Sequence, residues 1–86
     1  MLATVRFEEA KTIFNDPLLI TFLDEEHSEA EERFISIGIS ASNRVVLAVH
    51  TEREATEDLL IIRIISCREA TASERRVYEE GKEGKD

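Results

Sequence analysis

Three β-prone runs between residues 33 and 67 constrain the fold of this chain more than any other feature. Residues 33–40 read RFISIGIS, residues 44–51 read RVVLAVHT, and residues 59–67 read LLIIRIISC. In the first run isoleucine recurs at every second position, which is the side-chain period of a strand. The connections at residues 41–43 and 52–58 are too short for a crossover helix, so the runs are predicted to form an antiparallel meander.

The third run is apolar on both of its faces. Leu60, Ile62 and Ile64 would lie on one side, and Ile61 and Ile65 on the other. Because this pattern is typical of a strand covered from both sides, we predict that the third run is the central strand. A fourth strand is predicted at residues 18–23 (LLITFL), followed by a polar acidic loop at residues 24–32 that includes a helical turn.

Helical signals flank the strands. Phe7, Ala10 and Phe14 recur at helical spacing, and the Asn-Asp-Pro sequence that follows is expected to end this helix, because the residue before proline is pushed out of the helical region. Near the other end, Thr71 and Glu74 match a capping box, in which each side chain satisfies a free backbone amide. The box predicts a helix to about residue 80, with the following glycine as its C-cap.

The order of helix, four strands and helix places the chain in the α+β class. We expect a small four-stranded antiparallel sheet with an N-terminal and a C-terminal helix packed on it. Residues 1–81 are predicted to form a single domain, since 86 residues leave room for one small core. The charged residues 82–86 are expected to form a flexible tail.

Charge is unevenly distributed along the chain. The formal net charge is −8 at pH 7, from 11 basic and 19 acidic side chains, and a strongly acidic chain does not suit a nucleic-acid binder. Between residues 33 and 78, however, seven arginines and no lysine stand against six acids. The arginine guanidinium is a flat, always-charged fork that suits phosphate or carboxylate. The acidic excess lies in residues 1–32 and in the tail.

Several classes of protein are excluded or disfavoured. The single cysteine, Cys67, excludes an internal disulfide and fits a reducing compartment. We expect a soluble cytoplasmic protein with no membrane contact, because no signal-peptide pattern and no apolar run of membrane-spanning length is present. His27 and His50 have no further ligand at metal-site spacing, and no glycine-rich phosphate loop occurs, so no metal or cofactor is expected.

Arginines near the predicted strand ends are the remaining candidates for chemistry. In a metal-free ribonuclease, cations hold an RNA phosphate while a 2′-hydroxyl attacks it, and other groups accept and donate protons. His50, at a predicted strand end, would move a proton, and Tyr78 would donate a hydrogen bond or stack on a base. The arginines considered are Arg53, Arg63, Arg68, Arg75 and Arg76.

A structural interpretation of the same residues is also open. Arg63 would then pair with Glu32 or Glu74, and the two helix arginines would be charges that face solvent. His50 would be a strand-end residue without a role. Charge balance alone does not separate this interpretation from the first, since it bears on association and not on the fold.

Several stretches in this order resemble the BrnT toxin family. They are residues 5–17 (VRFEEAKTIFNDP), residues 31–38 (EERFISIG), residues 50–53 (HTER), residues 62–70 (IRIISCREA) and residues 74–79 (ERRVYE). The resemblance runs from about residue 5 to residue 81. It implies the toxin of a bacterial type II toxin–antitoxin pair, with a fold similar to the RelE and ParE toxins. It also implies a ribonuclease that arrests growth by stopping translation, neutralised by a ribbon-helix-helix antitoxin of the BrnA type.

One part of the family pattern is missing from this sequence. Typical members begin with a strand carrying a Trp-Asp pair and a helix ending in Lys-His-Gly, whereas here only residues 1–4 precede the first matched motif. The activity implied by the resemblance then rests on Arg53, Arg68 and Tyr78, with Glu32, Arg33 and His50 as secondary candidates. RNA-binding roles are expected for Arg33, Arg63, Arg75 and Arg76.

An open sheet edge and an open apolar face are expected where that first block is absent. The chain would then self-associate or need its antitoxin for solubility. A second function also stays open: a shortened toxin that binds an antitoxin but does not cut RNA, which the acidic first 32 residues favour. The third possibility is a free-standing α+β domain whose arginines are all structural.

Overall fold

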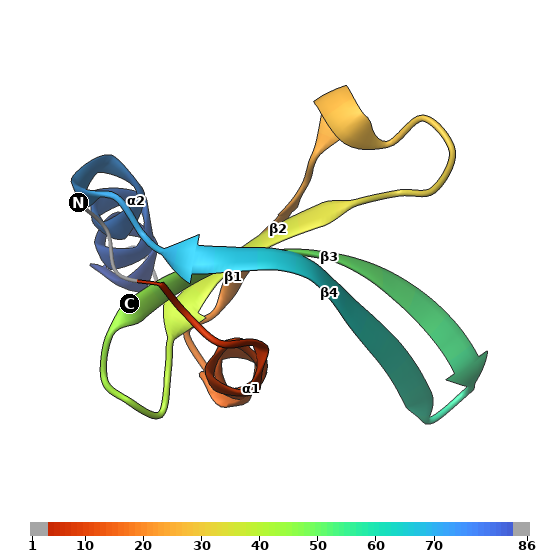
Figure 1. Ribbon diagram of the computed structural model, residues 1–86, viewed down its shortest axis with the longest axis horizontal. Coiled ribbons are helices and arrows are strands. Elements are labelled where there is room, and N and C mark those ends of the chain that lie inside the picture. Colours follow the sequence, from red (N-terminus) through yellow and green to blue (C-terminus); the bar gives the residue numbers. More distant parts are fainter. Residues whose placement is uncertain (1–3, 84–86) are drawn as a thin grey trace.

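The computed structural model describes residues 4–83 and confirms the α+β class. Four antiparallel strands form one sheet in the order β1-β2-β3-β4, with a short helix before it and a longer helix after it (Figure 1). The elements are α1 (Phe7–Lys11), the 3₁₀ helix η1 (Thr12–Asn15), β1 (Ile20–Leu23), the 3₁₀ helix η2 (Glu25–His27), β2 (Phe34–Ile39), β3 (Val45–Thr56), β4 (Leu59–Glu69) and α2 (Ala72–Glu83). The predicted meander and the helical turn in the acidic loop are therefore confirmed.

The prediction that the third apolar run is the central strand is wrong. Strand β4 lies at the edge of the sheet, next to β3 alone. Pairing of β2 with β3 ends at Phe34 and His50, so that beyond this rung β3 and β4 continue as a two-stranded projection (Figure 1). We call residues 51–63 the hairpin arm. Because it extends past the other strands, its apolar residues stay accessible, and Leu59 and Leu60 are 53% and 48% exposed.

Strand β3 is longer than the sequence indicated. It continues to Thr56, so the predicted connection at residues 52–58 shrinks to the turn at Glu57 and Asp58. The charged residues that suggested a loop alternate instead along an exposed strand, paired with β4. One consequence is that His50 lies inside β3, and its predicted position at a strand end is wrong.

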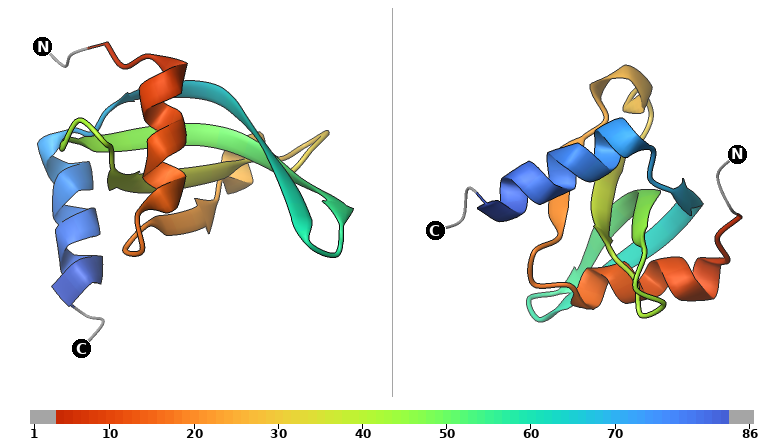
Figure 2. Two further views of the ribbon diagram at one scale, coloured as in Figure 1. Left: turned by 90° about the horizontal axis from the view of Figure 1, so that it is seen from below. Right: turned by 90° about the vertical axis from the view of Figure 1, so that its left-hand side faces the viewer.

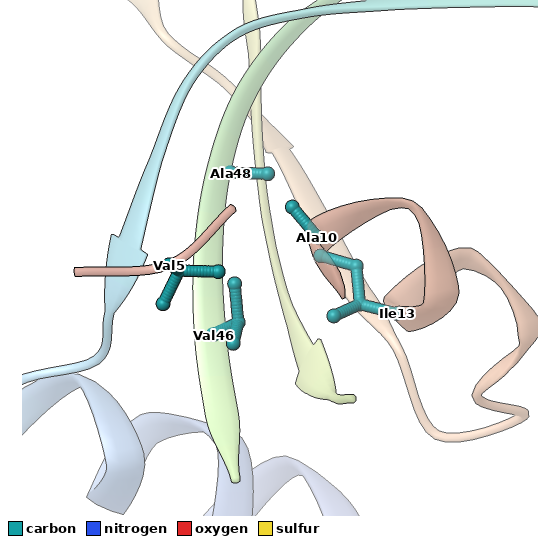
Figure 3. Packing of buried hydrophobic residues seen from close by; sticks show 5 residues of the cluster. All are labelled: Val5, Ala10, Ile13, Val46 and Ala48. Atoms are coloured by element: carbon teal, nitrogen blue, oxygen red, sulfur yellow. The ribbon is translucent and has the colours of Figure 1, made fainter. Parts of the chain in front are cut away.

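The sheet carries a small core on each face, and the two helices cover opposite faces (Figure 2). On the α1 face, the buried side chains are Val5, Ala10, Ile13, Val46 and Ala48, which meet between the first helices and strand β3 (Figure 3). On the α2 face, Tyr78 packs against Ile37 and Leu47. Alternate residues of β3 thus supply both cores, as the two-residue period requires.

Side-chain hydrogen bonds fix the ends of the helices. As predicted, the first helical segment ends before Asp16, whose carboxylate accepts hydrogen bonds from the backbone amides of Leu18 and Ile39 at 2.9 Å each. The capping box is confirmed: Glu74 accepts from the Thr71 amide at 2.9 Å, and its own amide donates to the Thr71 hydroxyl at 3.2 Å. Helix α2 continues past the predicted glycine cap to residue 83. Residues 84–86 of the predicted tail lie outside the described residues.

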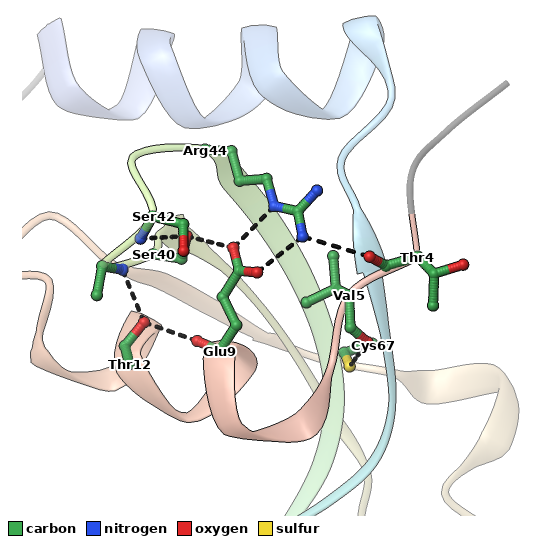
Figure 4. A network of polar contacts seen from close by, with 9 residues as sticks. Thr4, Val5, Glu9, Thr12, Ser40, Ser42, Arg44 and Cys67 are labelled. Carbon is green, nitrogen blue, oxygen red and sulfur yellow. Dashed lines mark hydrogen bonds and ion pairs between the residues drawn. The ribbon is translucent and has the colours of Figure 1, made fainter.

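A partly buried ion pair joins α1 to the turn between β2 and β3 (Figure 4). Arg44 donates to both carboxylate oxygens of Glu9, at 2.8 and 2.7 Å, and the Ser40 hydroxyl donates to the same carboxylate at 2.6 Å. These hydrogen bonds lower the pKa of Glu9 to about 2. Within residues 4–83, no helix combines the length and the apolar character that crossing a membrane requires.

Candidate nucleic-acid interface

Three arginines from separate segments lie on the α2 face, two of them on the hairpin arm and one just before β2. Arg33 precedes β2, Arg53 lies on β3 and Arg63 lies on β4. They line two adjoining hollows of about 350 and 200 Å³, which share Arg63 and Glu31. We call this pair of hollows the arginine hollow. Its other lining residues are His27, Glu29, Ala30, Thr51, Ile61 and Ile65.

The cross-strand register explains why these side chains share a face. Arg63 pairs with Thr51, and Ile61 pairs with Arg53, so that two successive rungs place a guanidinium on the α2 face. A register shift between Val49 and His50 adds a residue to β4 at this point, as in a β-bulge. Without it, positions 63 and 68 would lie on opposite faces, because they are an odd number of residues apart.

The guanidinium groups of the arginine hollow have few partners. Arg63 approaches Glu31 at 3.5 Å, with both side chains more than half exposed, and such an exposed pair contributes little to stability. Within residues 4–83, the guanidinium groups of Arg33 and Arg53 make no hydrogen bond or ion pair. They are therefore free to bind an anion. Glu29 and Glu31, which line the same hollow, will oppose that binding.

Arg68 lies on the same sheet face, but its guanidinium group is paired with a carboxylate of helix α2. It donates to both carboxylate oxygens of Glu74, at 2.6 and 2.8 Å. This pairing lowers the pKa of Glu74 to about 2 and raises the pKa of Arg68. Since Glu74 also caps the helix, the pair has a structural role at the N-terminus of α2. Arg75 and Arg76 are exposed on the same helix, and neither lines the arginine hollow.

His50 is fully buried on the opposite, α1 face of the sheet. Its Nε2 shares a hydrogen bond of 2.7 Å with the Ser36 hydroxyl, and its ring packs between Phe14 and Phe34. Its Nδ1 has no hydrogen-bond partner and lies 3.6 Å from the Glu52 carboxylate. Burial lowers the pKa of His50, so the neutral ring is favoured.

Tyr78 is also buried, with 4% of its surface exposed. Its hydroxyl donates to Asp16 at 2.6 Å, and burial together with this hydrogen bond raises the pKa of Tyr78 to about 12. The structure therefore does not bring Tyr78 or His50 to the arginine hollow. Glu32 is exposed and does not line it either.

His27 is a candidate that sequence reasoning missed. It follows the acidic stretch at the end of η2, lines the arginine hollow, and its side chain is 60% exposed. Its Nδ1 lies 3.1 Å from the Asp24 carboxylate, so a proton on Nδ1 leaves Nε2 to exchange a proton with a ligand. No periodic pattern marks this residue, because it reaches the hollow only through the path of the loop that joins β1 to β2.

The groups that would hold a metal ion do not gather in the part of the chain that is described. Among residues 4–83, no three His, Cys, Asp or Glu side chains lie together as a metal site requires. The hollow thus offers guanidinium groups, one histidine and carboxylates. Such a set can bind a phosphate and exchange a proton with it or with a neighbouring hydroxyl.

Comparison with known proteins identifies the family. No curated protein matches the chain. A family model described as "Ribonuclease toxin, BrnT, of type II toxin-antitoxin system" matches residues 4–74, which is most of the chain and includes Arg33, Arg53 and Arg63. This chain therefore belongs to the BrnT family, the toxins of type II toxin–antitoxin systems.

Proposed function

We propose that this chain is a metal-independent ribonuclease that arrests growth by stopping translation, and that it binds RNA phosphate in the arginine hollow. The observation that carries the proposal is the convergence of Arg33, Arg53 and Arg63 from three elements on one face. Arginine forks match phosphate oxygens. The family description names ribonuclease toxins, which supports this use of the surface.

The proposed reaction uses the ribose 2′-hydroxyl as nucleophile. His27, through Nε2, accepts the 2′-hydroxyl proton as the 2′-oxygen bonds to phosphorus. Asp24 holds the ring and stabilises the imidazolium that forms. Arg33 and Arg63 stabilise the additional negative charge of the pentavalent phosphorane. The bond from phosphorus to the 5′-oxygen then breaks, and that oxygen takes a proton from water. The His27 imidazolium returns its proton to the hydroxide that remains, which restores the neutral ring.

Purified protein and a labelled RNA test this proposal directly. We expect cleavage to persist in excess EDTA and to leave a 2′,3′-cyclic phosphate end. His27→Ala should lower the rate about 10²–10⁴-fold, the range for loss of a general acid or base. The matched control is His50→Gln, since His50 lies on the opposite face. Full activity of His27→Ala, or activity only with added metal, would contradict this mechanism.

The acidic surroundings of the hollow predict weak, salt-sensitive RNA binding. The three guanidinium groups, of which only Arg63 has a partner, the exposed Glu31, neutralise about three phosphates. This gives a slope of about −2 for log binding constant against log salt with single-stranded RNA. A basic nucleic-acid surface would have a steeper slope. Equilibrium binding of a non-cleavable 2′-deoxy oligonucleotide at several salt concentrations measures it.

A binding-only toxin homologue is the second candidate function. It is favoured by the burial of both His50 and Tyr78 and by the carboxylates of Glu29 and Glu31 in the hollow. Such a protein would bind an antitoxin, for which we propose the ribbon-helix-helix class, without cutting RNA in the cytoplasm. Growth arrest on expression that Arg53→Ala or Arg68→Ala abolishes would reject this second candidate, provided the variants stay folded.

A further inference from the structure

An apolar groove lies between α1 and the outer strand β4, on the face opposite the arginine hollow. Its volume is about 420 Å³, and its lining is Phe7, Lys11, Phe14, Ile62, Arg63 and Ile64. Phe7 is 45% exposed although it begins a helix that packs against the sheet. Arg63, at the edge of β4, borders both this groove and the arginine hollow. The groove is thus a hydrophobic surface without a cover among the described residues.

The hairpin arm extends this surface with a second, charged row. Glu52 pairs across the strands with Ile62, and Glu54 pairs with Leu60. Cross-strand partners point to the same face, so both rungs face the same side as the groove that Ile62 lines. The arm therefore presents an apolar row on β4 beside an acidic row on β3.

The spacing of these rows fits a helix. Successive rungs on one face of a strand are about 7 Å apart, and residues i and i+4 of a helix are about 6 Å apart along its axis. A helix laid along the arm covers the apolar and the acidic row at once. An extended segment added to the edge of β4 would prolong the sheet beside Ile62, leaving the acidic row uncovered.

The acidic residues of the hairpin arm indicate which kind of helix would bind. The row of Glu52 and Glu54, with Glu57 and Asp58 at the tip of the arm, is matched by lysine or arginine. A second copy of this chain is a poor occupant, because each copy carries a net charge of −8 and the same acidic arm. We propose that the groove and the hairpin arm bind a basic amphipathic helix of a protein partner. Its apolar side chains would contact Phe7, Leu60 and Ile62, and its cations the acidic row.

Labelled synthetic peptides test the proposal by fluorescence anisotropy at physiological ionic strength. One peptide is a helix with a leucine stripe flanked by lysines, the second is its scrambled form, and the third carries glutamate in place of lysine. The first should bind at least about tenfold more tightly than either of the others. Leu60→Asp should weaken it about tenfold, because apolar anchors carry most interface energy. In the double variant that combines Glu52→Gln with Glu54→Gln, most of the difference in affinity between the lysine peptide and the glutamate peptide should disappear.

Matched controls separate binding from folding. Val77→Asp changes a side chain on α2 that is 48% exposed, as Leu60 is, and should leave peptide binding unchanged. Circular-dichroism melting checks that each variant is folded. Equal binding of the scrambled peptide would overturn the proposal, as would equal binding of the glutamate peptide. A dimer in light scattering that Leu60→Asp dissociates would assign the surface to a second copy instead. RNA cleavage is read separately, so its failure leaves this test intact.

Discussion

Replacing Tyr78 with phenylalanine removes the hydroxyl that joins helix α2 to Asp16. The ring is retained against Ile37 and Leu47, so no cavity forms. The lost hydrogen bond, 2.6 Å long, has a carboxylate acceptor, and bonds to charged groups contribute about 1.5–3 kcal/mol. Because Asp16 keeps two backbone amide donors, we expect a loss near the low end, about 2 kcal/mol. For a domain of this size that lowers Tm by roughly 8–16 °C.

The pH dependence of unfolding gives this prediction a second signature. The pKa of Tyr78 is raised from 10 to about 12 in the folded protein. The stabilisation is therefore fully present below pH 10 and is lost as the pH rises through about 12. The free-energy difference between wild type and Tyr78→Phe should be constant at neutral pH and should shrink in that alkaline window.

Urea unfolding followed by circular dichroism measures both effects. Val77→Ala, at an exposed neighbouring position, should change stability by less than about 0.5 kcal/mol. Equal stability of Tyr78→Phe and wild type would refute the structural role of the hydroxyl. Loss of RNA cleavage by a fully folded Tyr78→Phe protein would show that Tyr78 takes part in the reaction although it is buried.

Three further stability predictions follow from other contacts. Glu9→Gln should make the free energy of unfolding depend less on pH under acidic conditions. The pKa of Glu9 is about 2 in the folded protein against 4.5 ordinarily, so its contribution to stability disappears as the pH falls from 4.5 through 2. Urea unfolding at several pH values checks this. Ser36→Ala should cost about 1–3 kcal/mol in the same assay, because it leaves Nε2 of the buried His50 unpaired. Gly38→Ala should lower Tm, because the added Cβ would lie 3.2 Å from Cβ of Ile13; unchanged Tm would mean that this packing relaxes freely.

Local patterns predicted most of the fold because they report local conformation. The alternation in β2 and the capping box at Thr71 both appear where the sequence indicated. The position of β4 was predicted wrongly because its apolar pattern shows which residue types lie on each face of the strand. The pattern does not show whether another element covers those faces. The same pattern arises in a strand that projects from the sheet, with Leu59 and Leu60 exposed.

The candidate site was harder to predict because tertiary contacts assemble it. Arg63 and Arg68 share a face only through the register shift in β4, which no sequence spacing signals. His27 reaches the hollow through the path of an irregular loop. His50 and Tyr78 have residue types suited to catalysis, but the core uses them for packing and hydrogen bonding. Arg33, Arg53 and Arg63 were named from the sequence, and the structure brings these three together.

The rate of RNA cleavage by Arg63→Ala, compared with Arg76→Ala, tests the central claim most directly. Both residues are exposed arginines, and only Arg63 lines the arginine hollow. Single-turnover cleavage of one labelled RNA gives both rates under the same conditions. We predict a loss of about 10²–10³-fold for Arg63→Ala, the range for removing a group that stabilises transition-state charge. Arg76→Ala should stay within about twofold of wild type, since it forms no part of the hollow. Equal rates for the two folded variants would contradict the assignment of the arginine hollow as the RNA site.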